Sequence, residues 1–237
     1  MAQSQGNAKN ILVGASPLFL SVDDSTVVGY AENMEPGTAK AGTAASGSTK
    51  PSTKVPAYSG SASYVTTLNA LDTDAEGGTN AAAYRNVGFT NNGLQITYNP
   101  TYDSVTVDQL LDTAKLFKSA MEVMIATEMS EGTLENTLVV FGQKKATLDS
   151  GVLGLAGGAL GEAPTERQLI AVGQAPTTSS PNSERVYYAR RVLSVQQSQF
   201  SLARTQATTF PVTFRLLPDA TYSGSEYGKI IDRTWTA

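Results

Sequence analysis

Short apolar and β-branched runs, separated by Gly, Pro, Asn and Asp, predict a chain built mainly from antiparallel strands. The clearest run is Gly93–Tyr98, where every second residue is apolar; this predicts a strand with one buried face. Asn91-Asn92-Gly93, just before it, predicts a turn. The predicted strands are Asn10–Val13, Leu18–Val22, Thr26–Tyr30, Tyr64–Leu68, Tyr84–Phe89, Gly93–Tyr98, Leu169–Val172, Arg185–Val195, Gln199–Thr205, Thr209–Leu217 and a closing edge strand at Tyr227–Asp232.

One short helix is predicted at Glu131–Phe141. Ser130 is its expected N-cap, and Glu131 and Glu135 lie near the positive end of the helix dipole. An apolar stripe of Leu134, Leu138 and Phe141 gives it a buried side, and Gly142 provides a stop.

The stretch Val107–Met129 fits two patterns. Its apolar residues from Val107 to Ile125 recur at helical spacing, whereas Met121, Val123, Ile125 and Thr127 alternate as in a strand. Periodicity by itself favours the helix.

Two segments are poor in residues that could be buried. Residues 31–62 consist mainly of Gly, Ala, Ser, Thr, Pro and Lys, which is typical of a flexible loop and predicts an insertion ordered by a neighbouring subunit. Residues 143–164 are rich in glycine. We expect the 237 residues to form one domain with long assembly loops.

Composition narrows the range of functions. The chain has no cysteine and no histidine, which excludes thiolate chemistry and removes the usual general base, so we do not expect an enzyme. The N-terminal residues show no secretory signal, and no segment is apolar for long enough to span a bilayer. The net charge is −4 without a dense basic cluster, which disfavours binding to nucleic acid.

Three clusters are candidate sites, and each favours a structural interpretation. Asp72-x-Asp74-x-Glu76-Gly77 imitates the first half of a calcium loop, but Ala83 stands where the closing Glu should be. The glycines of Gly151–Gly161 lack the Lys-Ser or Lys-Thr of a phosphate-binding loop. Asp23-Asp24 has no partner residue that the sequence places beside it. No catalytic, metal-binding or cofactor-binding residue is therefore nominated, and no cofactor is expected.

Four tyrosines are candidates for anchoring an interface, because a tyrosine buries a large ring and keeps one polar group. They are Tyr98, Tyr102, Tyr187 and Tyr188. Packing in the core or on the surface of a sheet is at least as good an interpretation of each.

The C-terminal third carries a recognisable pattern. Thr209-Phe210-Pro211-Val212-Thr213-Phe214-Arg215-Leu216-Leu217-Pro218-Asp219 is followed, after a gap, by Tyr227-Gly228-Lys229-Ile230-Ile231-Asp232-Arg233. Upstream stand Val107-Asp108-Gln109-Leu110-Leu111-Asp112 and Thr133-Leu134-Glu135-Asn136 in matching order. From about Asn92 to the end, the chain resembles the major tail proteins, or tail-tube proteins, of long-tailed bacteriophages.

The resemblance implies a β-sandwich or open barrel flanked by one short helix. It also implies hexameric rings that stack into a hollow tube, in which strands of neighbouring subunits form a continuous inner barrel. On this basis we expect a strand from about Ser119 to Glu128, against the helical periodicity. The implied location is the virion tail, assembled in the host cytoplasm, and the implied partners are other copies of the chain and the tape-measure, tail-terminator and distal-tail proteins.

In such a tube, DNA would pass through the lumen without specific binding, helped by a wall poor in Lys and Arg. The N-terminal residues, the loop 31–62 and the glycine-rich Gly151–Gly161 are the expected contacts between rings. Two alternatives stay open. The chain could be a tube or ring subunit of a related secretion or contractile-injection system, or a carbohydrate- or receptor-binding β-sandwich module, although its single tryptophan, Trp235, makes a poor aromatic platform.

Overall fold

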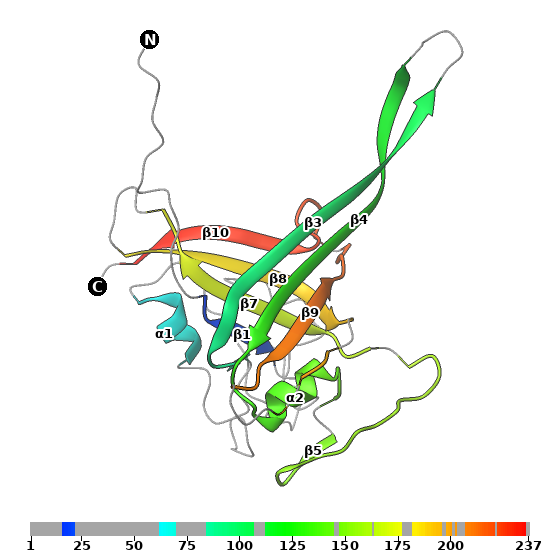
Figure 1. Cartoon of the computed structure of the whole chain (residues 1–237). Helices are drawn as coiled ribbons and strands as arrows, with labels where there is room; N and C mark the ends of the chain where they lie inside the picture. The colour runs from blue at the N-terminus through cyan, green and yellow to red at the C-terminus, as the bar shows by residue number, and fades with distance from the viewer. Residues whose placement is uncertain are drawn as a thin grey trace, which may run out of the picture.

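The computed structural model describes residues 16–21, 62–69, 84–106, 112–144, 147–162, 164–176, 182–195, 198–200, 202, 207–220 and 222–235. Over these residues the chain is mainly antiparallel β-structure, as the sequence predicts (Figure 1). The predicted strands Asn10–Val13 and Thr26–Tyr30, and the loop 31–62 apart from Ala62, lie outside the described residues.

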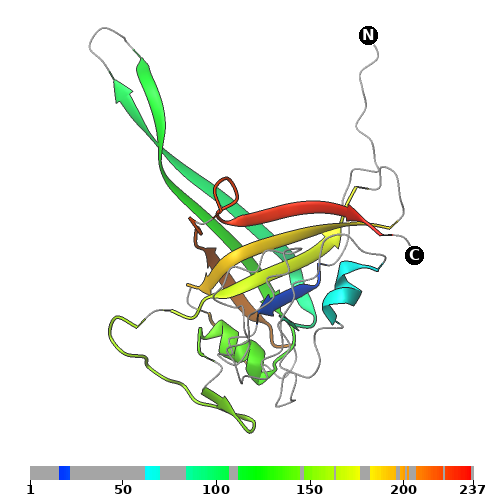
Figure 2. The ribbon, with the colours of Figure 1, turned by 180° about the vertical axis from the view of Figure 1, so that it is seen from behind.

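One eight-stranded sheet dominates the described part, in the order β2-β1-β7-β8-β9-β4-β3, with β10 also paired to β8. β8 forms a branch point: β10 pairs with residues 183–189 on one of its edges, and β9 pairs with residues 192–194 further along. The sheet therefore folds into two layers that cross (Figure 2). The strands are β1 (Leu18–Ser21), β2 (Tyr84–Asn86), β3 (Thr90–Thr106), β4 (Thr113–Met129), β7 (Arg167–Gln174), β8 (Ser183–Ser194), β9 (Phe210–Leu216) and β10 (Gly228–Thr234).

Successive side chains of β1 and β7 point to opposite faces of the sheet, so their buried residues belong to two cores. Leu18 and Leu20 point into the larger core, which also contains residues of β4, β9 and the helix α2 (Leu134–Val140). Phe19, between them, points into a smaller core on the opposite side of the sheet, under the helix α1 (Tyr64–Asn69). Because both faces are covered, β1 is buried along its whole length, which explains why Leu18, Phe19 and Leu20 are all apolar.

The predicted strand Tyr64–Leu68 is wrong, because this segment is the helix α1, and the described part thus has two helices rather than one. The Ser63 side chain accepts a hydrogen bond from the Thr66 N–H at 3.2 Å and so begins the helix. Tyr64 and Leu68, four residues apart, are both fully buried. In so short a segment the spacing of two apolar residues fits a helix or a strand, and the Ser63 cap favours the helix.

The predicted helix Glu131–Phe141 is confirmed as α2, with a different start. Thr133, not Ser130, is the N-cap, and its side chain accepts from the Asn136 N–H. Ser130 is still extended and donates its N–H to the Phe89 carbonyl. Gly142, at φ 63°, ends the helix as expected. The predicted buried stripe is corrected: Leu138 is buried together with Val139 and Val140, whereas Leu134 and Phe141 are exposed.

The strand predicted at Ser119–Glu128 is confirmed, and it is longer than expected. β4 runs over Thr113–Met129 and pairs with β3, so the helical periodicity of this stretch is misleading. The turn predicted at Asn91-Asn92-Gly93 is a β-bulge inside β3. Asn92 and Gly93 have φ of 60° and 67°, and the pairing register shifts there.

Most of the remaining strand predictions are confirmed within a residue or two, and one is wrong. Of Gln199–Thr205 the structure describes Gln199, Phe200 and Leu202, none of which is in a strand. Phe200 packs against the larger core instead, with its ring centroid 4.6 Å from that of Phe210. The glycine-rich segment contains a small unpredicted hairpin of β5 (Leu148–Asp149) and β6 (Val152–Leu153).

Candidate assembly surface

The β3–β4 hairpin extends well beyond the rest of the sheet (Figure 1). Each strand has 17 residues, so the hairpin is about 55 Å long. β9 pairs with β4 only along Met124–Met129. We call the two-stranded remainder, residues 100–106 and 113–121, the hairpin arm.

One side of the hairpin carries an apolar stripe that starts in the core and runs out along the arm. Paired residues of an antiparallel hairpin point to the same side, so the register defines the stripe. Ile125 and Val123 are buried, but Tyr98 and Leu116 are each 64% exposed. We call this side the apolar face: Ile96, Tyr98, Pro100 and Tyr102 of β3 with Leu116, Met121, Val123 and Ile125 of β4. One basic residue, Lys118, lies among them as the partner of Tyr102.

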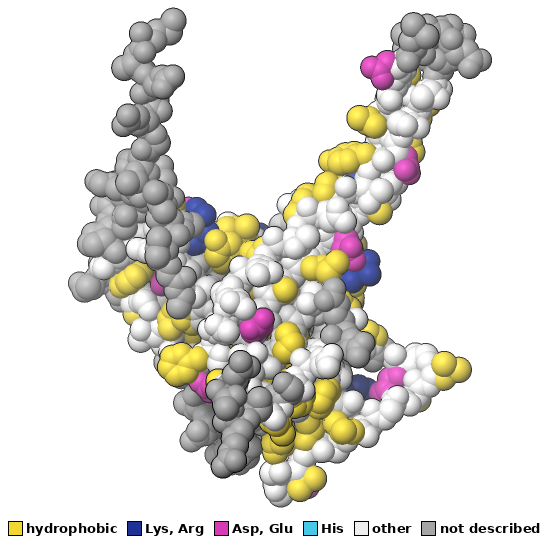
Figure 3. Space-filling view, in the orientation of Figure 1, with side chains coloured by type: hydrophobic (Ala, Val, Ile, Leu, Met, Phe, Trp, Pro, Cys, Tyr) yellow, Lys and Arg dark blue, Asp and Glu magenta, His cyan; other side chains and the backbone are white. Residues whose placement is uncertain are grey.

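The buried face predicted for Gly93–Tyr98 is therefore corrected. Ile96 and Tyr98 alternate as in a half-buried strand, yet both are exposed. Figure 3 shows hydrophobic side chains following the projecting hairpin toward its tip. An apolar stripe of this length on the surface of a folded chain marks an interaction site.

The opposite side of the hairpin, the polar face, has a different composition. On β3 it carries Thr97, Asn99, Thr101 and Asp103. On β4 it carries Glu122 and Glu128, and the neighbouring Arg215 of β9 pairs with Glu122 at 3.7 Å. Met124 and Ala120, the partners of Thr97 and Thr101, also lie on this side, and Val105 and Phe117 add exposed apolar surface near the tip.

The edges of the hairpin arm are open for pairing. Within the described part, β3 is the last strand of the sheet and pairs only with β4. The outer edge of β4 is covered by β9 only from Met124 onward. A long, open edge of this kind is a template for another chain, and a two-stranded ribbon is marginally stable by itself.

A groove lies between the hairpin and the strands β8 and β10. It has a volume of about 230 Å³ and is mostly apolar, with Ile96, Tyr98, Tyr187, Tyr227 and Ile230 in its lining. We call it the apolar groove. Lys229 also lines it, and the Lys118 Nζ stands 5.7 Å from the centre of the Tyr98 ring at its edge.

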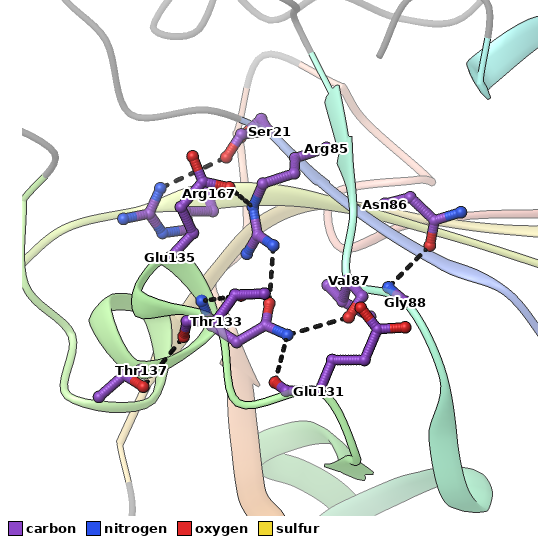
Figure 4. Close-up of polar contacts among 11 residues, drawn as sticks. Ser21, Arg85, Asn86, Val87, Gly88, Glu131, Thr133, Glu135, Thr137 and Arg167 are labelled. Carbon is purple, nitrogen blue, oxygen red and sulfur yellow. Dashed lines mark hydrogen bonds and ion pairs between the residues drawn. The ribbon is translucent and has the colours of Figure 1, made fainter. Parts of the chain in front are cut away.

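A buried polar cluster fixes the base of the hairpin to α2 and β2 (Figure 4). Asn136 accepts a hydrogen bond from the Arg85 Nη1 at 2.7 Å, and its own Nδ2 donates to the carbonyls of Val87 and Glu131. The Arg85 Nε also pairs with Glu135 at 3.1 Å. The Glu131 side chain accepts the Phe89 N–H at 3.0 Å, one residue before β3 begins. The direction in which the hairpin leaves the body is set here.

We expect Asn136→Ala to lower the free energy of unfolding by about 2–4 kcal/mol, because it leaves a buried guanidinium and two carbonyls without their amide partner. Urea denaturation followed by circular dichroism measures this. The matched control is the adjacent Thr137→Ala, whose hydroxyl donates only to the Thr133 carbonyl within the helix. Equal midpoints for the two variants would contradict the prediction.

Ion pairs join β8 to β10 across the sheet. Arg185 donates from Nε and Nη2 to the two oxygens of Asp232 at 2.5 and 2.7 Å, and these bonds hold the pKa of Asp232 below its usual value. Arg233 pairs with the buried Glu184, which also accepts the Tyr64 N–H at 2.6 Å. Burial raises the pKa of Tyr64 above its usual value. Each charge is compensated, so the arrangement is suited to holding strands together.

The four candidate tyrosines lie in different surroundings in the structure. Tyr98 and Tyr102 are exposed on the apolar face, Tyr187 lines the apolar groove, and Tyr188 is buried in the smaller core. The first pair thus suits an interface, and Tyr188 is a core residue. The alternation of apolar and polar residues in β3 is visible in the sequence, but it predicts a buried face and not an exposed one.

The other candidate clusters contribute no site in the described part. Asp23-Asp24, Asp72, Asp74, Glu76, Gly77 and Ala83 lie outside the described residues. Among the residues that are described, no His, Cys, Asp or Glu side chains group in a way that would hold a metal ion. Nor is any described helix long and apolar enough to cross a membrane.

No protein-family model matches the chain, and no curated protein matches its sequence.

Proposed function

We propose that this chain is a structural virion protein, the tail-tube subunit of a long-tailed bacteriophage, which assembles into stacked hexameric rings. The observation that carries the proposal is the apolar face: one stripe of side chains is core at its inner end and exposed along the hairpin arm. Burial of that stripe requires another protein surface. The resemblance of the C-terminal third to tail-tube proteins supplies the kind of assembly.

In the proposed ring, the open edges of the hairpin pair with neighbouring copies. Pairing around a closed ring covers both open edges of the hairpin, which explains how the chain tolerates a 17-residue edge strand. The outer part of the apolar face, Pro100, Tyr102, Leu116 and Met121, then packs outward against the bodies of the subunits, and the polar face lines the lumen.

A lumen built from the polar face suits the passage of DNA. Over the described part of this face, the carboxylates of Asp103, Glu122 and Glu128 stand against the basic groups of Lys115 and Arg215. Glu122 also pairs with Arg215, which leaves little free positive charge to hold phosphate. DNA would slide past without specific contacts, and the tape-measure, tail-terminator and distal-tail proteins would bind at the lumen and at the two ends.

The purified full-length chain at high concentration should form hollow tubes or rings with sixfold end views in electron microscopy. Size-exclusion chromatography should show large assemblies in equilibrium with small species. A chain that stays monomeric at every concentration, even with seeds of authentic tails, would overturn the proposal.

A further inference from the structure

A second projection leaves the body at the end opposite the hairpin arm. Residues 147–162, which we call the loop arm, comprise β5, β6 and the loop that follows, and they stand away from the sheet (Figures 1 and 2). Its apolar side chains are uncovered: Leu155 is 71% exposed, and Leu160 is fully exposed.

The loop arm is held in a defined shape. Ser150 and Gly151 both have positive φ, as the tight turn of the β5–β6 hairpin requires. The Gln143 side chain makes two hydrogen bonds with the backbone of Ala156, and Lys144 pairs with Glu162. Exposed leucines on an anchored loop lose little freedom when they bind, which favours a docking role.

The apolar groove offers a matching surface on the same chain. An apolar cavity of about 150 Å³ holds a benzene molecule, so a groove of about 230 Å³ has room for a leucine side chain. The charges are also complementary. Within the loop arm both charged residues, Asp149 and Glu162, are acidic; Glu162 pairs with Lys144, which leaves Asp149 on the β5–β6 hairpin to face a basic partner. Lys229 is the only charged residue that lines the groove.

The loop arm points away from the strands that line the groove: in Figures 1 and 2 it leaves the body on the side opposite β10 and the hairpin. The groove of its own chain is therefore not its partner. We propose that the loop arm of one copy inserts Leu155 and Leu160 into the apolar groove of a copy in the adjacent ring. Such a head-to-tail contact does not close on itself, so it repeats from ring to ring. This inference rests on the proposed tube and assigns its axial contact.

Disulfide trapping tests the contact directly, because the chain has no cysteine of its own. In Leu160→Cys/Ile230→Cys, one new thiol lies on the loop arm and the other on the groove. Disulfides form only between closely placed residues, so oxidised tubes should give a ladder of linked chains that extends beyond six on a non-reducing gel. The matched control is Leu160→Cys/Thr97→Cys, which moves the second thiol to the polar face and should give no ladder.

A loss-of-contact variant provides a second measurement. Leu155→Ser/Leu160→Ser alters only exposed side chains, so its circular dichroism spectrum and melting temperature should match those of the unmodified chain. We expect rings to form, but the protein concentration needed for tubes should rise about tenfold or more.

The outcomes separate this inference from the function it rests on. Suppose that the unmodified chain forms tubes. The inference is then overturned, and the tube is not, by any of three results: no ladder from Leu160→Cys/Ile230→Cys, an equal ladder from the control, or normal tube growth of Leu155→Ser/Leu160→Ser. An unmodified chain that never assembles would overturn both.

Discussion

The single substitution Tyr102→Glu should leave the folded monomer intact and abolish assembly, raising the protein concentration needed for rings by at least about a hundredfold. Tyr102 is exposed on the hairpin arm, outside the groove, and its cross-strand partner is Lys118. The new carboxylate is therefore harmless in the monomer. In an assembled ring the new carboxylate would have to leave water together with Lys118, and the desolvation of this charged pair opposes assembly. The contact area of the tyrosine ring would also be lost.

The neighbouring Thr101→Glu is the matched control. It adds the same charge to the same strand, but on the polar face, which lines the lumen in the proposed tube. We expect its assembly threshold to stay within about threefold of the unmodified chain. Sedimentation velocity over a concentration series measures both thresholds, with circular dichroism to check the fold. Normal rings from Tyr102→Glu, or an equal defect in both variants, would show that the apolar face is not the contact.

The strand composition of the chain can be predicted from the sequence because it depends on local alternation and on turn residues. β7, β8, β9 and β10 all lie close to their predicted ranges. The position of α2 is also confirmed, since Leu138 and the terminal Gly142 lie where the pattern places them. Its cap, Thr133, and the exposure of Leu134 and Phe141 differ from the prediction.

The hairpin is harder to predict, because periodicity reports where apolar residues lie and not what covers them. The alternation of Ile96 and Tyr98 predicts a buried face, and the isolated chain leaves that face exposed. Both facts agree if another subunit supplies the cover. An interface face and a core face carry the same pattern, so only the structure of the single chain tells them apart.

Other features depend on long-range contacts that no sequence window contains. Asn136 is an ordinary polar residue in the sequence, yet it joins Arg85 of β2 to the start of the hairpin. The apolar groove likewise combines β3 and β4 with β8 and β10, whose pairing could not be foreseen from spacing.

Gly228 occupies the position where a methyl group should be most damaging. Its φ is +147°, and a Cβ there would lie 1.9 Å from the backbone oxygen of Tyr188 in the paired strand β8. The loop that leads into it is fixed as well: Arg190 stacks at 3.6 Å on the Tyr222 ring and donates to the Ser225 carbonyl. Neither backbone can move away without breaking the β8–β10 pairing.

We therefore expect Gly228→Ala to lower the free energy of unfolding by about 3 kcal/mol or more and to expose the amides of β10 to hydrogen exchange. Gly142→Ala is the control, because Gly142 also has positive φ, 63°, but no atom lies within 4 Å of the position that its methyl group would take. It should lose only about 1 kcal/mol, the cost of the backbone conformation. Urea denaturation measures the free energy of unfolding of both variants. Equal losses would show that the clash at Gly228 does not destabilise the fold.

Gly228 also lines the apolar groove, so its substitution connects stability with assembly. If the loop arm of an adjacent copy docks in the groove, Gly228→Ala should impair tube growth even under conditions where most chains remain folded, because β10 forms one wall. Gly142→Ala leaves that wall unchanged and should assemble normally once its smaller loss of stability is offset by lower temperature. Equal tube growth by the two folded variants would separate the groove from assembly.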